Sequence, residues 1–187
     1  MRVTGGLWRS RRLRGPTRHQ KLRPTPDAMR ERFFSVLGPR VIDARVLDLF
    51  AGTGAVGIEA LSRGAARAVF VEIHRSAIKL IRANLDALGV SPDHTAVINR
   101  PAARAIDDLG RARQTFDLIW ADPPFPIWEG GAEALDAAVG SGLTSGDTVL
   151  CLECPAEADV DRVLSPRLAT VRDLKGGASR VVILRRS

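Results

Sequence analysis

The stretch from Val46 to Leu61, VLDLFAGTGAVGIEAL, decides the fold class. It reads as a strand, a tight loop and a helix, and Gly52, Gly54 and Gly57 match G-x-G-x-x-G in that setting. Glu72 ends the next predicted strand, 20 residues after Gly52, where an acid can accept hydrogen bonds from a ribose diol. The stretch therefore predicts a loop that binds a ligand with an adenosine-like ribose. The alternative is a tight turn that needs glycines only for its shape.

Asp48 separates the two ligand classes that such a loop takes. It stands four residues before Gly52, near the carboxyl end of the first strand. A dinucleotide pyrophosphate bound at the next helix would be repelled there. S-adenosylmethionine carries an ammonium and a sulfonium, and both are attracted by a carboxylate. D-x-x-x-G-x-G followed by Glu72 therefore favours S-adenosylmethionine. The chain has no G-x-x-x-x-G-K-[ST] motif of a P-loop NTPase.

Outward from this unit, strand and helix patterns alternate along the chain. Such alternation predicts an α/β protein with a parallel sheet covered on both faces. Two last strands, joined by Gly176-Gly177, predict an antiparallel hairpin at one edge. The expected strands are 45–50, 67–72, 95–99, 116–121, 148–153, 168–175 and 180–185. The expected helices are 26–37, with Thr25 as its N-cap, and 55–63, 76–88, 102–109, 132–139 and 156–164.

The composition describes one globular domain with an appendage. The 187 residues are 45% hydrophobic and 26% charged. No run of 18 apolar residues exists, and the first 15 residues lack the apolar core of a secretory signal. Two cysteines, at 151 and 154, exclude a disulfide scaffold. We expect a cytoplasmic protein that does not bind a membrane.

The positive charge is concentrated at the N-terminus. Residues 1–26 carry a charge of +8 with no acid, and the other 161 residues carry −1. This asymmetry indicates a polyanionic partner, most often nucleic acid, although a solvated tail would have the same charge. Val3-Thr4, Gly5-Gly6 and Leu7-Trp8 suggest a short β-hairpin. We predict a basic arm at 1–25 and a catalytic domain at 26–187 that folds without it. RNA binding is assigned to Arg9, Arg11, Arg12, Arg14, Arg18, Lys21 and Arg23.

A second motif follows the fourth predicted strand. FDLIWA runs directly into Asp122-Pro123-Pro124-Phe125. The first and fourth strands flank the switch point of this fold type, where ligands collect. The Asp122 carboxylate and the Pro123 carbonyl can accept the N–H bonds of an exocyclic amine on a planar base, and Phe125 can stack on that base. The motif predicts methylation of such an amine, while a merely stiff strand exit is the structural alternative.

These segments resemble a known family. RVTGGLWRSRRL, LRPTPDAMRERFFSVL, VLDLFAGTGAVGIEALSRGA and ADPPF occur in the same order in the bacterial 16S ribosomal RNA (guanine(966)-N2)-methyltransferases. The resemblance implies a Rossmann-like seven-stranded methyltransferase sheet, S-adenosylmethionine as methyl donor and a guanine of 16S ribosomal RNA, in an assembling 30S particle, as substrate. It implies that Asp122, Pro123 and Phe125 hold the guanine. Cofactor contacts are assigned to Asp48, Ala51, Gly52, Thr53, Gly54, Glu72, Ile73 and Ala102.

Other functions stay open on the sequence alone. D-P-P-F accepts any planar amino group, so adenine N6 in DNA or a glutamine amide in a protein is an alternative substrate. A non-catalytic RNA chaperone or assembly factor, acting through the arm, is the alternative outside enzymes. The scattered histidines and the lone C-x-x-C pair do not favour a metal site, and we expect none. We expect a monomer. Trp120 is expected in the core, and Trp128 is a candidate for the pocket wall.

Overall fold

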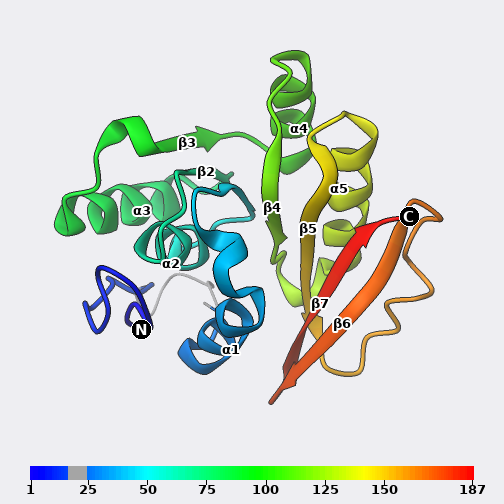
Figure 1. The fold of residues 1–187 in the computed structure, drawn as a ribbon, viewed down its shortest axis with the longest axis horizontal. Coiled ribbons are helices and arrows are strands. Elements are labelled where there is room, and N and C mark those ends of the chain that lie inside the picture. Colours follow the sequence, from blue (N-terminus) through cyan, green and yellow to red (C-terminus); the bar gives the residue numbers. More distant parts are fainter. Residues whose placement is uncertain (17–24) are drawn as a thin grey trace.

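The computed structural model describes residues 1–16 and 25–187, and a seven-stranded sheet forms its centre (Figure 1). The strands lie in the order β3-β2-β1-β4-β5-β7-β6. The first five are mutually parallel, and β7 and β6 continue the sheet as an antiparallel pair. Their bounds are β1 Arg45–Leu49, β2 Arg67–Glu72, β3 Thr95–Asn99, β4 Phe116–Ala121, β5 Thr144–Pro155, β6 Leu168–Gly176 and β7 Ser179–Arg186.

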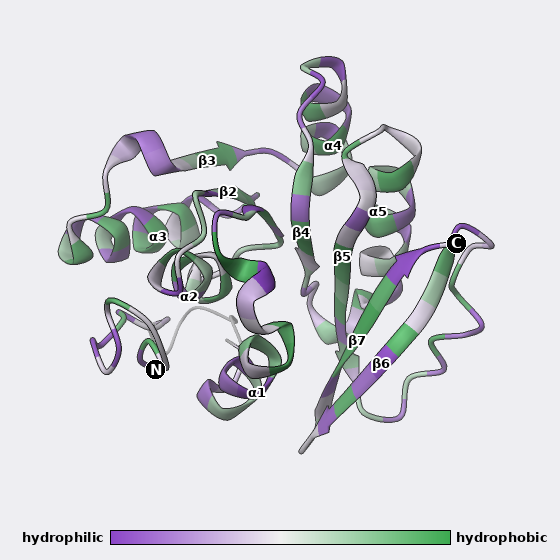
Figure 2. Ribbon diagram, viewed as in Figure 1, coloured by the Kyte–Doolittle hydropathy of each residue, from purple (hydrophilic) through white to green (hydrophobic). Residues whose placement is uncertain are grey.

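Helices cover both faces of the sheet, as the strand–helix alternation predicts. The helices are α1 Asp27–Leu37, α2 Ala55–Ser62, α3 Arg75–Leu88, α4 Ala102–Arg111 and α5 Glu129–Gly140. One hydrophobic core joins α1, α2 and α3 to the sheet, and a second joins α4 and α5 to the opposite face. Strands with a core on each face need hydrophobic residues along most of their length, and Figure 2 shows that β4, β5 and β7 are mostly hydrophobic. No described helix is long and apolar enough to cross a membrane.

Most of the predicted elements are confirmed, and one is wrong. The strands at 67–72, 95–99 and 116–121 have the predicted bounds, and β5 is longer at both ends than predicted. The helix predicted over 156–164 is a run of turns and irregular structure. Val160 is the only residue of this segment that is buried, so the segment presents no continuous apolar stripe to the sheet.

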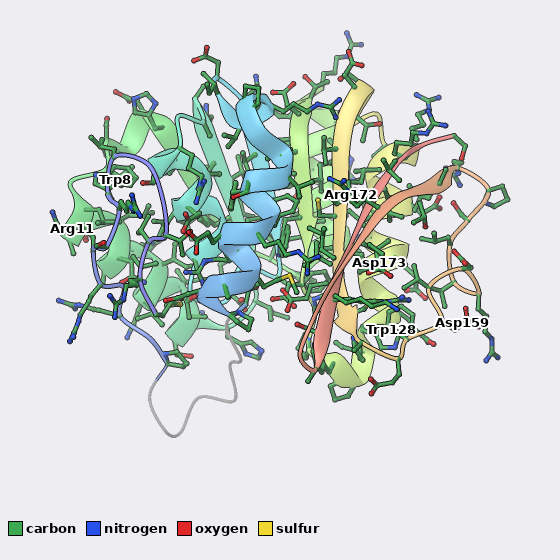
Figure 3. The ribbon with its side chains drawn as sticks, turned by 60° about the horizontal axis from the view of Figure 1, so that its bottom comes forward. Trp8, Arg11, Trp128, Asp159, Arg172 and Asp173 are labelled. Carbon is green, nitrogen blue, oxygen red and sulfur yellow. The ribbon has the colours of Figure 1, made fainter. Side chains whose placement is uncertain are left out.

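The N-terminal arm, residues 1–16, packs against the body. Its two sides are joined by one antiparallel bridge between Arg2 and Arg12, with Val3 buried beneath. The turn is wider than the predicted Gly5-Gly6 pair. Those glycines instead allow close approach to the end of α2: a Cβ on Gly6 would lie 1.8 Å from the Ser62 carbonyl oxygen. Figure 3 shows the exposed side of the arm, with Trp8 and Arg11 far from the β6–β7 hairpin.

A buried ion pair anchors this arm. Glu59 of α2 is completely buried and accepts hydrogen bonds from the backbone N–H groups of Thr4, at 2.9 Å, and Gly5, at 2.8 Å. Arg30 of α1 is also completely buried; its Nε lies 3.8 Å from Glu59 Oε2, and its Nη2 donates to the Arg2 carbonyl. The arm backbone is therefore part of the hydrogen-bonding of two buried charges, and not a separate tail.

Candidate functional site

The site lies where the topology predicts it, at the carboxyl ends of β1 and β4. These strands are parallel neighbours, with Leu49 beside Ala121. The loops that follow them line a cavity of about 540 Å³. The cavity brings together the glycine loop, the end of β2, the turn after β4 and the segment between β3 and α4. Two motifs separated by some 70 residues therefore form one site.

The glycine loop is shaped by two different requirements. Gly52 has a φ of +54°, and a Cβ on it would meet only the Phe50 carbonyl oxygen, at 3.9 Å. The loop thus leaves open space in which a ligand can approach its backbone. Gly57 serves packing, because a Cβ there would lie 2.3 Å from the ring of Phe70 on β2. The third glycine of the motif therefore brings α2 close to the sheet.

Glu72 links the end of β2 to the glycine loop. One carboxylate oxygen accepts the Gly52 N–H at 2.8 Å, and the other accepts the His74 N–H, also at 2.8 Å. These bonds fix the orientation of a carboxylate that is 5% exposed and lines the cavity. Each carboxylate oxygen has a second lone pair for a ligand hydroxyl. The carboxylate that the sequence predicts as a ribose acceptor therefore lines the cavity in a fixed orientation.

Asp48 supplies a buried acid beneath the same loop. It is 2% exposed, lines the cavity, and accepts a hydrogen bond from the Gly57 N–H at 3.0 Å. Burial raises the pKa of its carboxyl from 3.8 to about 7; the Gly57 bond lowers this pKa and the nearby Glu72 charge raises it. A cation in the cavity would favour the ionised form. This acid therefore matches a positively charged ligand.

Two residues that the sequence did not point to complete the other end of the cavity. The Thr25 hydroxyl lies 3.1 Å from Asp122 Oδ2 and 2.8 Å from Glu153 Oε2. Thr25 was predicted to cap α1, but it makes no capping bond; Pro26 occupies the N-cap position. Thr25 lines the cavity, and these two contacts place it beside the carboxyl ends of β4 and β5. Glu153 is 3% exposed and lies in β5.

The turn after β4 presents the flat and apolar surface that the sequence predicts. Pro123 is buried, Phe125 is half-buried, and both line the cavity. Trp120 is 1% exposed and packs edge-on against Phe33 of α1, with 4.8 Å between the ring centroids, which confirms its core position. It also borders the cavity. Trp128 is not part of the cavity wall; it packs against the core beneath α5.

The structure brings the residues predicted to hold the base and the cofactor into one cavity, with a single exception, and the predicted RNA-binding residues that it describes are not part of that cavity. All the assigned cofactor residues line the cavity except Gly54, whose absent side chain makes room for Ile81 and Phe70 behind the loop. In the arm, Arg9, Arg11, Arg12 and Arg14 are exposed. Arg18, Lys21 and Arg23 lie outside the described residues. Among residues 1–16 and 25–187, no group of three or more acidic, histidine or cysteine side chains could hold a metal ion.

Comparisons with known proteins agree with this fold. The structure of "Putative methyltransferase yhhF from Escherichia coli" has a TM-score of 0.79 and 28% identity, over 100% of this chain and 97% of that one. The Escherichia coli protein "Ribosomal RNA small subunit methyltransferase D" is 39% identical over 125 residues, 67% of this chain and 60% of the relative. The Bacillus subtilis "Putative rRNA methyltransferase YlbH" is 38% identical over 67% of each chain.

The seven-stranded sheet, with its glycine loop and two cavity acids, is that of the S-adenosylmethionine-dependent methyltransferase class. Within that class the chain belongs to the family described as Conserved hypothetical protein 95, whose model matches residues 1–185. The aligned region spans less than two thirds of the Escherichia coli relative's own length.

Proposed function

We propose that this protein transfers a methyl group from S-adenosylmethionine to the exocyclic N2 amine of a guanine in 16S ribosomal RNA. The observation that carries the proposal is the shared cavity: the Asp122 turn opens into the same space as the Asp48 and Glu72 carboxylates. The name of the Escherichia coli relative refers to RNA of the small ribosomal subunit and that of the Bacillus subtilis relative to rRNA, and both support ribosomal RNA as the substrate. We expect a cytoplasmic monomer acting on an assembling 30S particle.

The residues divide the chemistry between two ends of the cavity. Bound S-adenosylmethionine supplies an electrophilic methyl group, and Glu72 and Asp48 would hold its ribose and its cationic part. Asp122 and the Pro123 carbonyl would each accept one N–H of the amine, and so direct its lone pair at the methyl carbon. As the N–C bond formed and the methyl–sulfur bond broke, leaving a neutral thioether, the Asp122 carboxylate would stabilise the positive charge that develops on nitrogen and would accept the proton that the nitrogen loses. Phe125 would stack on the base, which must leave its helix or be unpaired.

Nucleoside mass spectrometry of ribosomal RNA tests the proposal. Small-subunit RNA from cells that lack this protein should lose one N2-methylguanosine, and purified protein with S-adenosylmethionine should restore it. Transfer to DNA adenine or to a protein glutamine, in the same labelled-methyl assay, would replace the proposal by the corresponding alternative. Absence of any methyl transfer, together with RNA binding, would favour an assembly factor.

Glu72→Ala should weaken S-adenosylmethionine binding about 10- to 150-fold, because a hydrogen bond to a charged group contributes roughly 1.5–3 kcal/mol. Isothermal titration calorimetry measures the effect. The exposed Glu133 of α5 lies outside the cavity, so Glu133→Ala is the matched control and should bind normally. Tighter binding of NADH than of S-adenosylmethionine by the native protein would contradict the argument from Asp48.

Cofactor affinity should depend on pH through Asp48. The pKa of this carboxyl is raised to about 7, so below pH 7 a cation can bind favourably only as the carboxyl loses its proton. The affinity for S-adenosylmethionine should therefore rise by up to about tenfold per unit between pH 5.5 and 7, and level off above. Asp48→Asn should remove most of this slope, because it keeps the shape of the side chain and removes its ionisable group. An unchanged slope in Asp48→Asn would exclude Asp48 as its source.

The arm should supply much of the RNA affinity through its exposed arginines. Reversing Arg9, Arg11 and Arg12 to Glu leaves the contacts of the arm backbone with Glu59 in place and removes one Arg11 hydrogen bond to the Ala87 carbonyl. It should reduce the slope of log K against log salt by about 0.7–0.9 per lost phosphate contact. Filter binding to a ribosomal RNA hairpin at several salt concentrations measures this. The matched control reverses Arg104, Arg111 and Arg113, which are exposed on or next to α4 on the opposite face. Equal slopes in the two variants would mean that the arm does not bind RNA.

A further inference from the structure

The sheet register places a second carboxylate beside the predicted catalytic one. Ala121 of β4 is paired with Leu152 of β5, so Asp122 and Glu153 each follow a paired residue on parallel neighbouring strands. Both lie two residues beyond side chains of the same core, Trp120 and Cys151, and side chains two apart on a strand point to the same face. The two acids therefore project side by side toward α1.

The Thr25 hydroxyl contacts both carboxylates, which places them close together. Its oxygen lies 3.1 Å from Asp122 Oδ2 and 2.8 Å from Glu153 Oε2, so these two carboxylate oxygens cannot be farther apart than the sum of the two distances. A hydroxyl has one proton and donates to one carboxylate at a time. Glu153 is 3% exposed and lines the cavity, and a buried carboxylate is costly unless it has a structural or a binding role.

We propose that Glu153 is a specificity-determining residue that accepts the N1–H of the target guanine while Asp122 accepts its N2–H. This inference rests on the proposed function and adds the reading of the base. The Watson–Crick edge of guanine presents two neighbouring donors, N1–H and N2–H, and then the O6 acceptor. Adenine presents an acceptor at N1. Two adjacent carboxylates therefore attract guanine and repel the N1 lone pair of adenine.

A buried donor in the same wall completes this complementarity. The indole N–H of Trp120 is buried and has no hydrogen-bond partner in the described part of the chain. Trp120 borders the cavity on the face from which Asp122 and Glu153 project. Two acceptors and one unused donor match the two donors and one acceptor of the guanine edge. Thr25 would give up its contact with one carboxylate as the base enters.

The test compares guanine with 2-aminopurine, which keeps the N2 amine but has an acceptor at N1 and no oxygen at C6. Substrate RNA hairpins carry one or the other base at the methylated position, and transfer of a labelled methyl group is measured as kcat/KM. The native protein should prefer guanine by about 10- to 100-fold, the discrimination expected of one or two base-edge hydrogen bonds. Equal rates on the two bases would overturn the proposal without any variant being made.

Glu153→Gln separates base reading from a structural role. Its amide can donate to the N1 of 2-aminopurine, so activity on guanine should fall about tenfold or more while activity on 2-aminopurine is kept or rises. Equal losses on both bases, or full activity on guanine, would overturn the proposal. Glu157→Gln is the matched control, because Glu157 is exposed and outside the cavity. Cofactor affinity and melting temperature check the fold of each variant.

The assay distinguishes an error in the proposed function from an error in the role of Glu153. If the native protein transfers no methyl group to the guanine hairpin or to ribosomal particles, the proposed function is wrong. If it methylates guanine and 2-aminopurine alike, the function stands and the role of Glu153 is wrong.

Discussion

Asp122→Ala abolishes methyl transfer, with a fall in kcat of about a thousandfold or more, while S-adenosylmethionine affinity stays within a few-fold of native. This is the expected result because Asp122 stands at the substrate end of the cavity, with Thr25 and Glu153, and the predicted cofactor contacts come from other loops. Without its carboxylate the amine loses both an orienting acceptor and the charge that stabilises the transition state, and loss of one such group costs on the order of 10²–10³ or more in kcat.

The measurement is single-turnover transfer of a labelled methyl group, with calorimetry for cofactor binding. Asp159→Ala is the control, since Asp159 is exposed, lies in the irregular segment after β5 (Figure 3), and is not among the residues that line the cavity. Asp122→Asn keeps the shape but removes the charge, and should retain intermediate activity. Near-native kcat in Asp122→Ala would refute the mechanism.

Glu59→Ala destabilises the fold and releases the arm. Removing one partner of a buried ion pair costs about 3–5 kcal/mol because the other charge is left buried and unpaired. Here Arg30 loses its buried partner and keeps only the partly exposed Asp27, at 2.9 Å. Arg63 loses an ion pair of 2.9 Å with Glu59, and the N–H groups of Thr4 and Gly5 lose their acceptor. At about 2–4 °C per kcal/mol for a chain of this size, the melting temperature should fall by roughly 6–20 °C.

Thermal unfolding and hydrogen exchange test this together. Amides of residues 1–16 should lose protection in Glu59→Ala and keep it in Glu133→Ala, which removes an exposed carboxylate from another helix. A native melting temperature in Glu59→Ala would show that the pair contributes nothing. The same contacts determine what a truncation would do. Deleting the arm exposes the core residues that Val3 covers, and removes the Arg2 carbonyl from Arg30 and the Thr4 and Gly5 N–H groups from Glu59. A chain that starts at Thr25 should therefore be less stable than the sequence suggests. Charge reversal is therefore the better test of RNA binding.

Local patterns in the sequence determined the elements and the cofactor end of the site. The alternation of short apolar runs with helical stripes sets strands such as 95–99 and 116–121, because residue periodicity is a property of neighbours along the chain. The glycine loop and the D-P-P-F turn are contiguous motifs, and the acid stands 20 residues after Gly52, so all three can be found from spacing along the chain. Topological rules then bring them to one crevice, since parallel strands end at the same edge.

Only the tertiary structure decided which distant polar residues meet. Thr25 looks like a helix cap in sequence, yet its hydroxyl lies between the carboxylates of Asp122 and Glu153, because the residues just before α1 lie beside the carboxyl ends of β4 and β5. In the sequence, Glu153 is a single acid in the otherwise apolar run 149–154, and Glu59 is a single acid in a mostly apolar helix. Their roles depend on strand register and on the docking of the arm, which join residues from 54 to 128 positions apart. Contacts over such separations leave no periodic signal in the chain, because burial and partner are set by packing and not by neighbours in sequence.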